Sequence, residues 1–175
     1  MIALETLLHG GDVRTLHGVA NVVDIVLHEP ARFDELVACL SHDDATVRMR
    51  AADAAEKVTR ARPELLPPHR AALVELAATT EQPSLRWHLA EMLPRMRLDP
   101  NEERAAVALL RRYLDDRSAI VKVAALQALA DLTECDPSLR RPVVAAIRAA
   151  VATGSAAVRS RGEKLLGKLE RGRAT

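Results

Sequence analysis

Aromatic side chains are nearly absent from this sequence of 175 residues, in which Phe33, Trp87 and Tyr113 are the whole set. Hydrophobic residues nevertheless make up 49% of the chain, so Ala, Leu, Val and Ile have to build the core. That composition suits close-packed helices better than strands. The length is sufficient for one domain with a continuous core. We therefore expect a single helical domain.

Cysteines and long apolar runs are also scarce. Cys39 and Cys135 are too few and too far apart in the sequence for a disulfide framework. Charged residues interrupt every apolar segment before the roughly 20 residues that a bilayer crossing needs, and no basic, apolar and small-residue signal opens the chain. These features predict a soluble protein of the reducing cytoplasm, with no membrane partner.

The net charge is small, at +1 at neutral pH, which argues against a protein that is basic throughout and coats nucleic acid. The charge is unevenly distributed, however. Residues 137–175 carry nine Lys or Arg and two acids, whereas residues 1–136 carry sixteen and twenty-two. Either this basic end makes weak, salt-sensitive contacts with polyanions, or it is a solvated cap. The candidate contact residues are Arg161, Lys164, Lys168 and Arg171.

Prolines recur at a regular interval along the chain. Successive members of the series are 33, 37 and 37 residues apart, and each follows a polar residue, as is typical of helix starts. A large aliphatic residue stands ten positions after each one, which predicts the buried face of a first helix. The four prolines are Pro30, Pro63, Pro100 and Pro137, and the aliphatic residues are Leu40, Leu73, Leu110 and Ile147.

A second register with the same period predicts a partner helix for each first helix. An aliphatic–basic pair recurs at intervals of 38, 36 and 37 residues, three positions after a residue that can cap a helix. The pairs are Val47-Arg48, Leu85-Arg86, Val121-Lys122 and Val158-Arg159, and the capping residues are Asp44, Gln82, Ser118 and Ser155. A looser copy of this second-helix pattern runs from Asp12 to Leu27. Together with the short helix predicted before Gly10-Gly11, it would form a further helix pair. Pro94 lies inside the second helix of the third repeat and predicts a kink or an early end of that helix.

The segment from Asp44 to Ala52 resembles the second-helix motif of the HEAT repeat family, with a polar cap, Val-Arg and then small residues. The resemblance covers nearly the whole chain. It implies an all-α fold, a right-handed α–α superhelix of five antiparallel helix pairs, with the second helices on the concave face. The units are 1–29, 30–62, 63–99, 100–136 and 137–171, within one domain over 1–171, and 172–175 form a disordered tail.

Common catalytic constellations do not occur in the sequence. It contains no Gly-rich phosphate loop, Cys-x-x-Cys, His-Glu-x-x-His or Gly-x-Ser-x-Gly. No two histidines have the three- or four-residue spacing that places metal ligands on one helix face. Ser41 to Asp44 contain the residue types of a catalytic triad, but neighbours in sequence do not reach one another, so a polar turn is favoured. We expect no enzyme activity, no cofactor and no metal.

The basic residues of the second register form a ladder with one member in each repeat. It is either a track for phosphates or acidic peptides, or a set of structural partners for the turns between helices. In the HEAT family such a residue pairs with an acid of the turn, so the structural role is favoured, with Asp43 and Asp116 as the expected partners. The members are Arg14, Arg48, Arg86, Lys122 and Arg159.

Outward positions of the second helices are the candidates for partner binding. At about 100° per residue, Met49, Trp87 and Val123 lie opposite the buried face and would form one apolar strip. A more polar line and flanking residues lie beside the strip: Asp53, Glu91, Gln127, Arg50, His88 and Arg95. Trp87 is either a binding hot spot or a ring that fills space against a neighbouring helix.

These features predict a non-enzymatic scaffold that holds an extended or helical segment of a partner protein in its concave groove. The alternative is a HEAT-like alkylpurine DNA glycosylase or another protein that binds nucleic acid, with Trp87 and Asp53 near the base. A single Trp and a near-neutral groove make nucleic acid the less favoured partner. The chain is expected to be a monomer or a weak homodimer.

Overall fold

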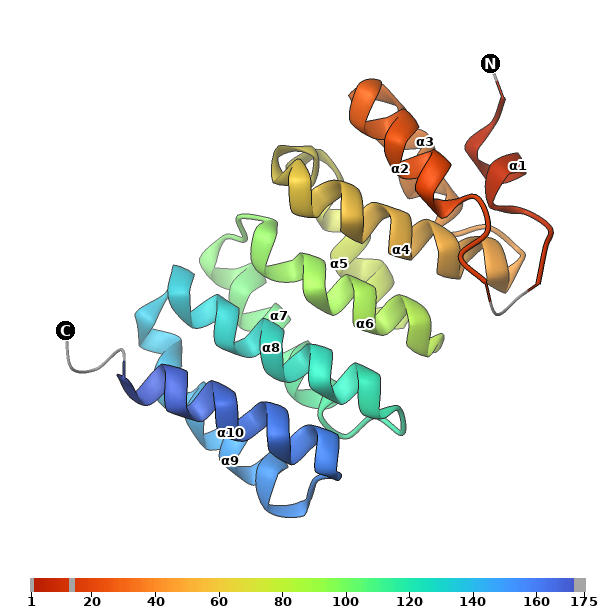
Figure 1. Cartoon of the computed structure of the whole chain (residues 1–175). Helices are drawn as coiled ribbons and strands as arrows, with labels where there is room; N and C mark the ends of the chain where they lie inside the picture. The colour runs from red at the N-terminus through yellow and green to blue at the C-terminus, as the bar shows by residue number, and fades with distance from the viewer. Residues whose placement is uncertain (1, 13–14, 172–175) are drawn as a thin grey trace. The chain divides into compact units, whose positions relative to one another are not determined.

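The computed structural model describes residues 2–12 and 15–171 (Figure 1). This part of the chain is all-α: it contains ten α-helices, packed in sequential antiparallel pairs, and no strand. The five pairs expected from the two registers are therefore confirmed. The helices are α1 (Leu4–Leu8), α2 (Val19–His28), α3 (Phe33–Cys39), α4 (Ala45–Ala61), α5 (Arg70–Thr79), α6 (Pro83–Met92), α7 (Pro100–Tyr113), α8 (Ala119–Cys135), α9 (Arg140–Thr153) and α10 (Ala156–Arg171).

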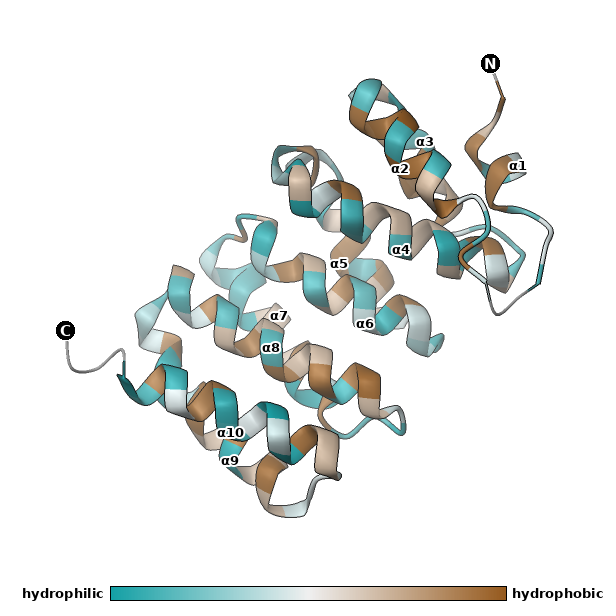
Figure 2. Ribbon diagram, viewed as in Figure 1, coloured by the Kyte–Doolittle hydropathy of each residue, from teal (hydrophilic) through white to brown (hydrophobic). Residues whose placement is uncertain are grey.

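The chain divides into two compact units, with the boundary between Met96 and Arg97. In the first unit α4 packs against α2, α3 and α6, and α5 packs against α6. In the second unit α8 packs against α7, α9 and α10, and α10 packs against α9. Apolar and polar residues alternate along the helices of each unit (Figure 2). The expectation of one domain over 1–171 stays a prediction.

The four repeat prolines open helical structure in two different ways. Pro100 is the first residue of α7, and Asp99 and Glu102 form a capping box in which Asp99 Oδ1 accepts from the Glu102 amide at 2.9 Å. Pro30, Pro63 and Pro137 instead open short 3₁₀ turns. The α-helix follows directly in the first and last of these, whereas a second 3₁₀ turn over Pro67–His69 precedes α5. Proline lacks a backbone N–H, but the N–H groups of a first helical turn have no acceptor within the helix, so proline is tolerated in either kind of first turn.

Two predicted features of the second helices are confirmed. Asp44 caps α4, because its Oδ1 accepts from the Thr46 amide at 2.7 Å. Helix α6 ends at Met92 and continues as a 3₁₀ turn over Leu93–Arg95. Pro94 lies in this turn, as expected for a residue without the N–H of a continuing α-helix.

The start of the second helix of the first repeat was predicted wrongly. Helix α2 begins at Val19, not at Asp12, because Gly18 adopts a left-handed conformation with φ of 74°. A Cβ at Gly18 would lie 1.8 Å from the Leu7 carbonyl oxygen, so the chain passes α1 where only glycine fits. Val13 and Arg14, which belonged to the predicted helix, lie outside the described residues.

Small residues let the helices of each unit approach closely. In α4, Ala51, Ala52, Ala54 and Ala55 are all buried. Gly162 does the same for α10, since a Cβ there would lie 2.3 Å from Val151 Cγ2 of α9. The Ala-rich composition of the sequence is therefore used at helix contacts, as it would be in a core with few aromatics.

Candidate functional site between helices α4 and α6

Three of the ladder residues that the structure describes bind the turn of their own repeat. Arg48 donates to the carbonyl oxygens of His42 and Asp43 at 2.6 and 2.9 Å. Arg86 donates to the Thr80 carbonyl at 2.8 Å, and Arg159 to that of Gly154 at 2.7 Å. A structural role is thus supported for these three. The acceptors of these hydrogen bonds are backbone carbonyls, because the last carbonyls of a first helix and its turn lack intrahelical donors. Pairing of the ladder with Asp43 and Asp116 stays a prediction. Arg14 lies outside the described residues.

Arg50 was expected to flank an exposed patch, and this is wrong. Its side chain is fully buried and donates to the carbonyls of Leu8, Gly10, Asp12 and Thr15 at 2.6–3.0 Å. These acceptors belong to α1 and to the loop that follows it, which the helical phase of α4 alone does not reveal. Arg50 is therefore a structural clamp for the N-terminal loop.

Asp53 and His88 were also expected to face solvent, but they are 7% and 2% exposed. Helix α4 packs against α2 on one side and against α6 on another. Its buried surface is therefore wider than the single apolar face on which the sequence prediction was based. Met49, Trp87 and Glu91 remain half-buried in the same unit. The Trp87 ring stacks on the His88 ring, with centroids 3.5 Å apart.

Val123 and Gln127 are half-buried residues of the second unit. Their alignment with Met49 and Trp87 in one strip stays a prediction. The Gln127 side chain donates to Asp131 Oδ1 at 2.5 Å and accepts from Arg161 at 2.5 Å.

The basic end is only partly paired. Of the four candidate contact residues, Arg161 binds Gln127 and Lys168 binds Glu134 at 2.5 Å, and that carboxylate raises the pKa of Lys168. Lys164 and Arg171 are exposed on α10.

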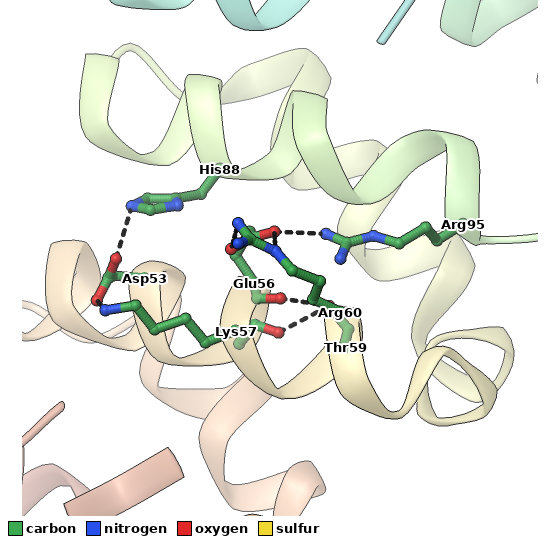
Figure 3. A network of polar contacts seen from close by, with 8 residues as sticks. Asp53, Glu56, Lys57, Thr59, Arg60, His88 and Arg95 are labelled. Atoms are coloured by element: carbon green, nitrogen blue, oxygen red, sulfur yellow. Dashed lines mark hydrogen bonds and ion pairs between the residues drawn. The ribbon is translucent and has the colours of Figure 1, made fainter. Parts of the chain in front are cut away.

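A cluster of charged residues lies between α4 and α6 in the first unit (Figure 3). We refer to it as the α4–α6 cluster. Its centre is Glu56, whose side chain is 5% exposed and accepts from three guanidinium nitrogens. Arg60 Nε and Nη2 lie 3.1 and 2.7 Å from its two oxygens, and Arg95 Nη2 lies 3.0 Å from Oε1. The members are Asp53, Glu56, Lys57, Arg60, His88, Glu91 and Arg95.

His88 occupies the side of the cluster away from the arginines. Its Nε2 lies 3.8 Å from Asp53 Oδ1, and Lys57 Nζ holds the other oxygen of Asp53 at 2.6 Å. The buried Nδ1 has no hydrogen-bond partner within the described residues. Burial lowers the pKa of His88 to about 4, so the ring is neutral at neutral pH.

Glu91 completes the cluster one turn after His88 on α6. Burial, and then the charge of Glu56, raise the pKa of this half-buried carboxyl group. One ligand atom each from Glu56, His88 and Glu91 lies within 4.8 Å of the other two. The His-x-x-Glu spacing was visible in the sequence, but only histidine pairs were considered there. Glu56 joins through the packing of α6 on α4, for which the sequence carries no local signal.

Within the described residues, five antiparallel helix pairs, three of them with an arginine that binds the turn of its own repeat, define a protein of α-helical hairpin repeats. The sequence pattern of HEAT repeats matches residues 33–130, more than half of the chain, so the protein belongs to the HEAT repeat family. It is also similar to the crystal structure of an engineered protein solved by the Northeast Structural Genomics Consortium. That match has a TM-score of 0.64 at 18% identity, over 97% of this chain and 78% of the other.

The comparison with curated proteins finds no match. Among the residues that the structure describes, no helix combines the length and the apolar character that a membrane crossing requires.

Proposed function

We propose that this protein is a non-enzymatic scaffold that binds an extended or helical segment of a partner protein along its second helices. HEAT repeats commonly mediate protein interactions, and the chain belongs to that family. The observation that carries the proposal is the position of Trp87, the only Trp, which is half-buried on α6 and therefore partly open to solvent. The buried His88 ring supports one side of the indole, so the other side offers a rigid apolar surface at little entropic cost.

Met49 extends this surface at the equivalent place on α4, 38 residues earlier. Its flexible thioether adapts to partners of different shape. Glu91, four residues after Trp87, lies on the same face of α6 and would fix the register of a basic partner residue.

The nucleic-acid alternative has less support at this surface. If the protein were a DNA glycosylase, Asp53 would have to lie near the target base. Asp53 is only 7% exposed and is bound by Lys57, so a base could not easily reach it. The neighbourhood also contains as many carboxylates as cations, which does not favour a polyanion.

Capture experiments with matched variants test the proposal. We expect the tagged protein to capture a partner from an extract of its native host, and Trp87→Ala to weaken that binding by roughly 2 kcal/mol or more. Ile120→Ala, which shortens a side chain that is 60% exposed elsewhere on the surface, should bind normally. Equal capture by all three proteins would contradict the proposed surface.

Thermal unfolding of Trp87→Ala decides between a binding surface and core packing. Because the ring is half-buried and stacks on one neighbour, we expect a loss of about 1–2 kcal/mol in the free energy of unfolding. A loss of about 3–5 kcal/mol, as for a fully buried aromatic, would identify Trp87 as core and end the hot-spot interpretation.

A further inference from the structure

Glu56, His88 and Glu91 bring a nitrogen and two carboxylates together in a largely buried place. Ligand atoms of these residues are all within 4.8 Å of one another. Zinc binds imidazole nitrogen and carboxylate oxygen at about 2.0–2.2 Å, so its ligands lie about 3–4 Å from one another. Small rotations of the two Glu side chains are enough to close the difference.

The His88 ring is oriented as a metal ligand would be. Figure 3 shows one ring nitrogen turned to Asp53 and the other on the side of Glu56. If Nε2 carries the proton and points at Asp53, the lone pair of Nδ1 faces the cluster. A carboxylate behind the second nitrogen of a histidine is the usual outer-shell arrangement of metal sites. Here Lys57 in turn fixes that carboxylate.

The ligand atoms of His88 and Glu91 are not used by the protein. Nδ1 of His88, a residue 98% buried, has no hydrogen-bond partner within the described part of the chain. Glu91 makes no hydrogen bond or ion pair with any residue of that part, although it is half-buried. A buried polar atom without a partner is costly, and a ligand would relieve that cost.

We propose that Glu56, His88 and Glu91 bind a first-row divalent transition-metal ion such as Zn²⁺. A nitrogen ligand with two carboxylates suits this class, whereas Ca²⁺ and Mg²⁺ prefer sites made of oxygen alone. Three protein ligands leave a fourth position for water. The site shares Glu91 with the proposed partner-binding surface, and the Trp87 ring covers one face of His88. Metal binding is nevertheless tested on the protein alone, without a partner.

The ion has to compete with the guanidinium groups on Glu56. The Arg60 side chain is 69% exposed, so it can turn to solvent when the ion takes its place. Arg95, at 21% exposed, is held more tightly. This competition weakens metal binding and makes a prediction of its own: removal of Arg60 should increase the affinity.

Zinc titration of the metal-stripped protein tests the site, with isothermal calorimetry for affinity and thermal unfolding for stability. We expect one Zn²⁺ per chain and a rise in Tm. Glu91→Gln should lower the affinity by about 100-fold, since it replaces an anionic carboxylate ligand with a neutral, weakly binding amide, while the metal-free Tm stays nearly unchanged. Arg60→Gln should raise the affinity by about tenfold, the range of outer-shell effects. A merely structural role of the cluster does not predict tighter binding.

Two controls separate this site from others on the chain. Glu103→Gln, on α7, removes another half-buried acid and should leave zinc binding unchanged. His9→Ala should do the same, although His9 lies 3.4 Å from Asp44 and beside the His42 ring on the surface. The proposal is overturned if the protein takes up no zinc, if Glu91→Gln binds as well as the wild type, or if His9→Ala abolishes binding.

Discussion

Among the described residues Arg50 has the largest fully buried side chain, and none of its hydrogen bonds there goes to a carboxylate. Four backbone carbonyls solvate the guanidinium instead. The carbonyls after α1 have no donors within a helix, and a buried guanidinium needs an acceptor for each of its N–H groups. Each side of the contact therefore supplies the hydrogen bonds that the other lacks. The planar fork of arginine can serve four acceptors, which lysine cannot do.

We therefore predict that Arg50→Met lowers the free energy of unfolding by about 3 kcal/mol or more, because buried carbonyls lose charged donors. Urea unfolding followed by circular dichroism measures the loss. Arg117→Met, at an exposed position of the second unit, is the matched control and should change stability by less than about 0.5 kcal/mol. Equal stability of the two variants would show that the four hydrogen bonds contribute nothing net.

Glu35 connects α1 to the start of α3 through ionised hydrogen bonds. Its Oε1 accepts from the Leu4 amide at 2.6 Å, and its Oε2 accepts from Arg32 at 2.7 and 3.0 Å. Burial acts to raise the pKa of Glu35, but these hydrogen bonds and the charge of Arg32 outweigh it and lower the pKa.

A carboxyl group with a lowered folded-state pKa stabilises the protein above its unfolded pKa, and this contribution is lost as the pH falls through the folded value. We predict that Glu35→Gln reduces stability at pH 7 and has a much smaller effect near pH 3. Thermal unfolding of both proteins across this range provides the measurement. A Tm difference that is the same at both pH values would contradict the role of the ionised form.

At the scale of the element, α10 contains two glycines with opposite surroundings. A Cβ at Gly162 would meet Val151 Cγ2 at 2.3 Å, in the contact with α9. At Gly167 the nearest atom is the end of the flexible Arg171 side chain, at 3.3 Å. Glycine is therefore required for packing at the first position and costs only helix propensity at the second.

The prediction is that Gly162→Ala destabilises the protein by about 1–3 kcal/mol through overpacking. Gly167→Ala should stabilise it by about 0.5–1 kcal/mol. Thermal unfolding of the pair, in the same helix, separates packing from propensity. If both substitutions stabilise, α9 and α10 do not approach as closely as described.

Helix ends and pairs could be predicted from the sequence because their causes are local. The cap at Asp44 and the end of α6 before Pro94 depend on residues within one turn. The burial of Asp53 and His88 could not be predicted, because it depends on how many neighbours α4 and α6 have. For the same reason the His88–Glu91 pair was readable in one helix, whereas its third member on α4 was not.

At the scale of the whole molecule, residues 137–175 carry an excess of positive charge. This excess allows a test of whether attraction to a polyanion depends on a local group of charges or on the net charge of the chain. The sum over the chain is only +1, so attraction to a polyanion would have to arise from the basic end itself. Exposed charges reinforce one another within a Debye length of about 8 Å at physiological ionic strength. Arg161 and Lys168 are engaged with Gln127 and Glu134, which leaves Lys164 and Arg171 as the cations to change.

We predict weak retention on heparin at low salt that decreases steeply as salt is added, since polyanion binding releases counterions. Lys164→Glu with Arg171→Glu should abolish this retention. Arg112→Glu with Arg117→Glu changes the net charge by the same amount at exposed positions elsewhere in the second unit and should largely preserve it. If the two double variants elute together and earlier than the wild type, the total charge governs the interaction and the basic end is a solvated cap. If neither variant differs from the wild type, the cations on α10 do not contact the polyanion.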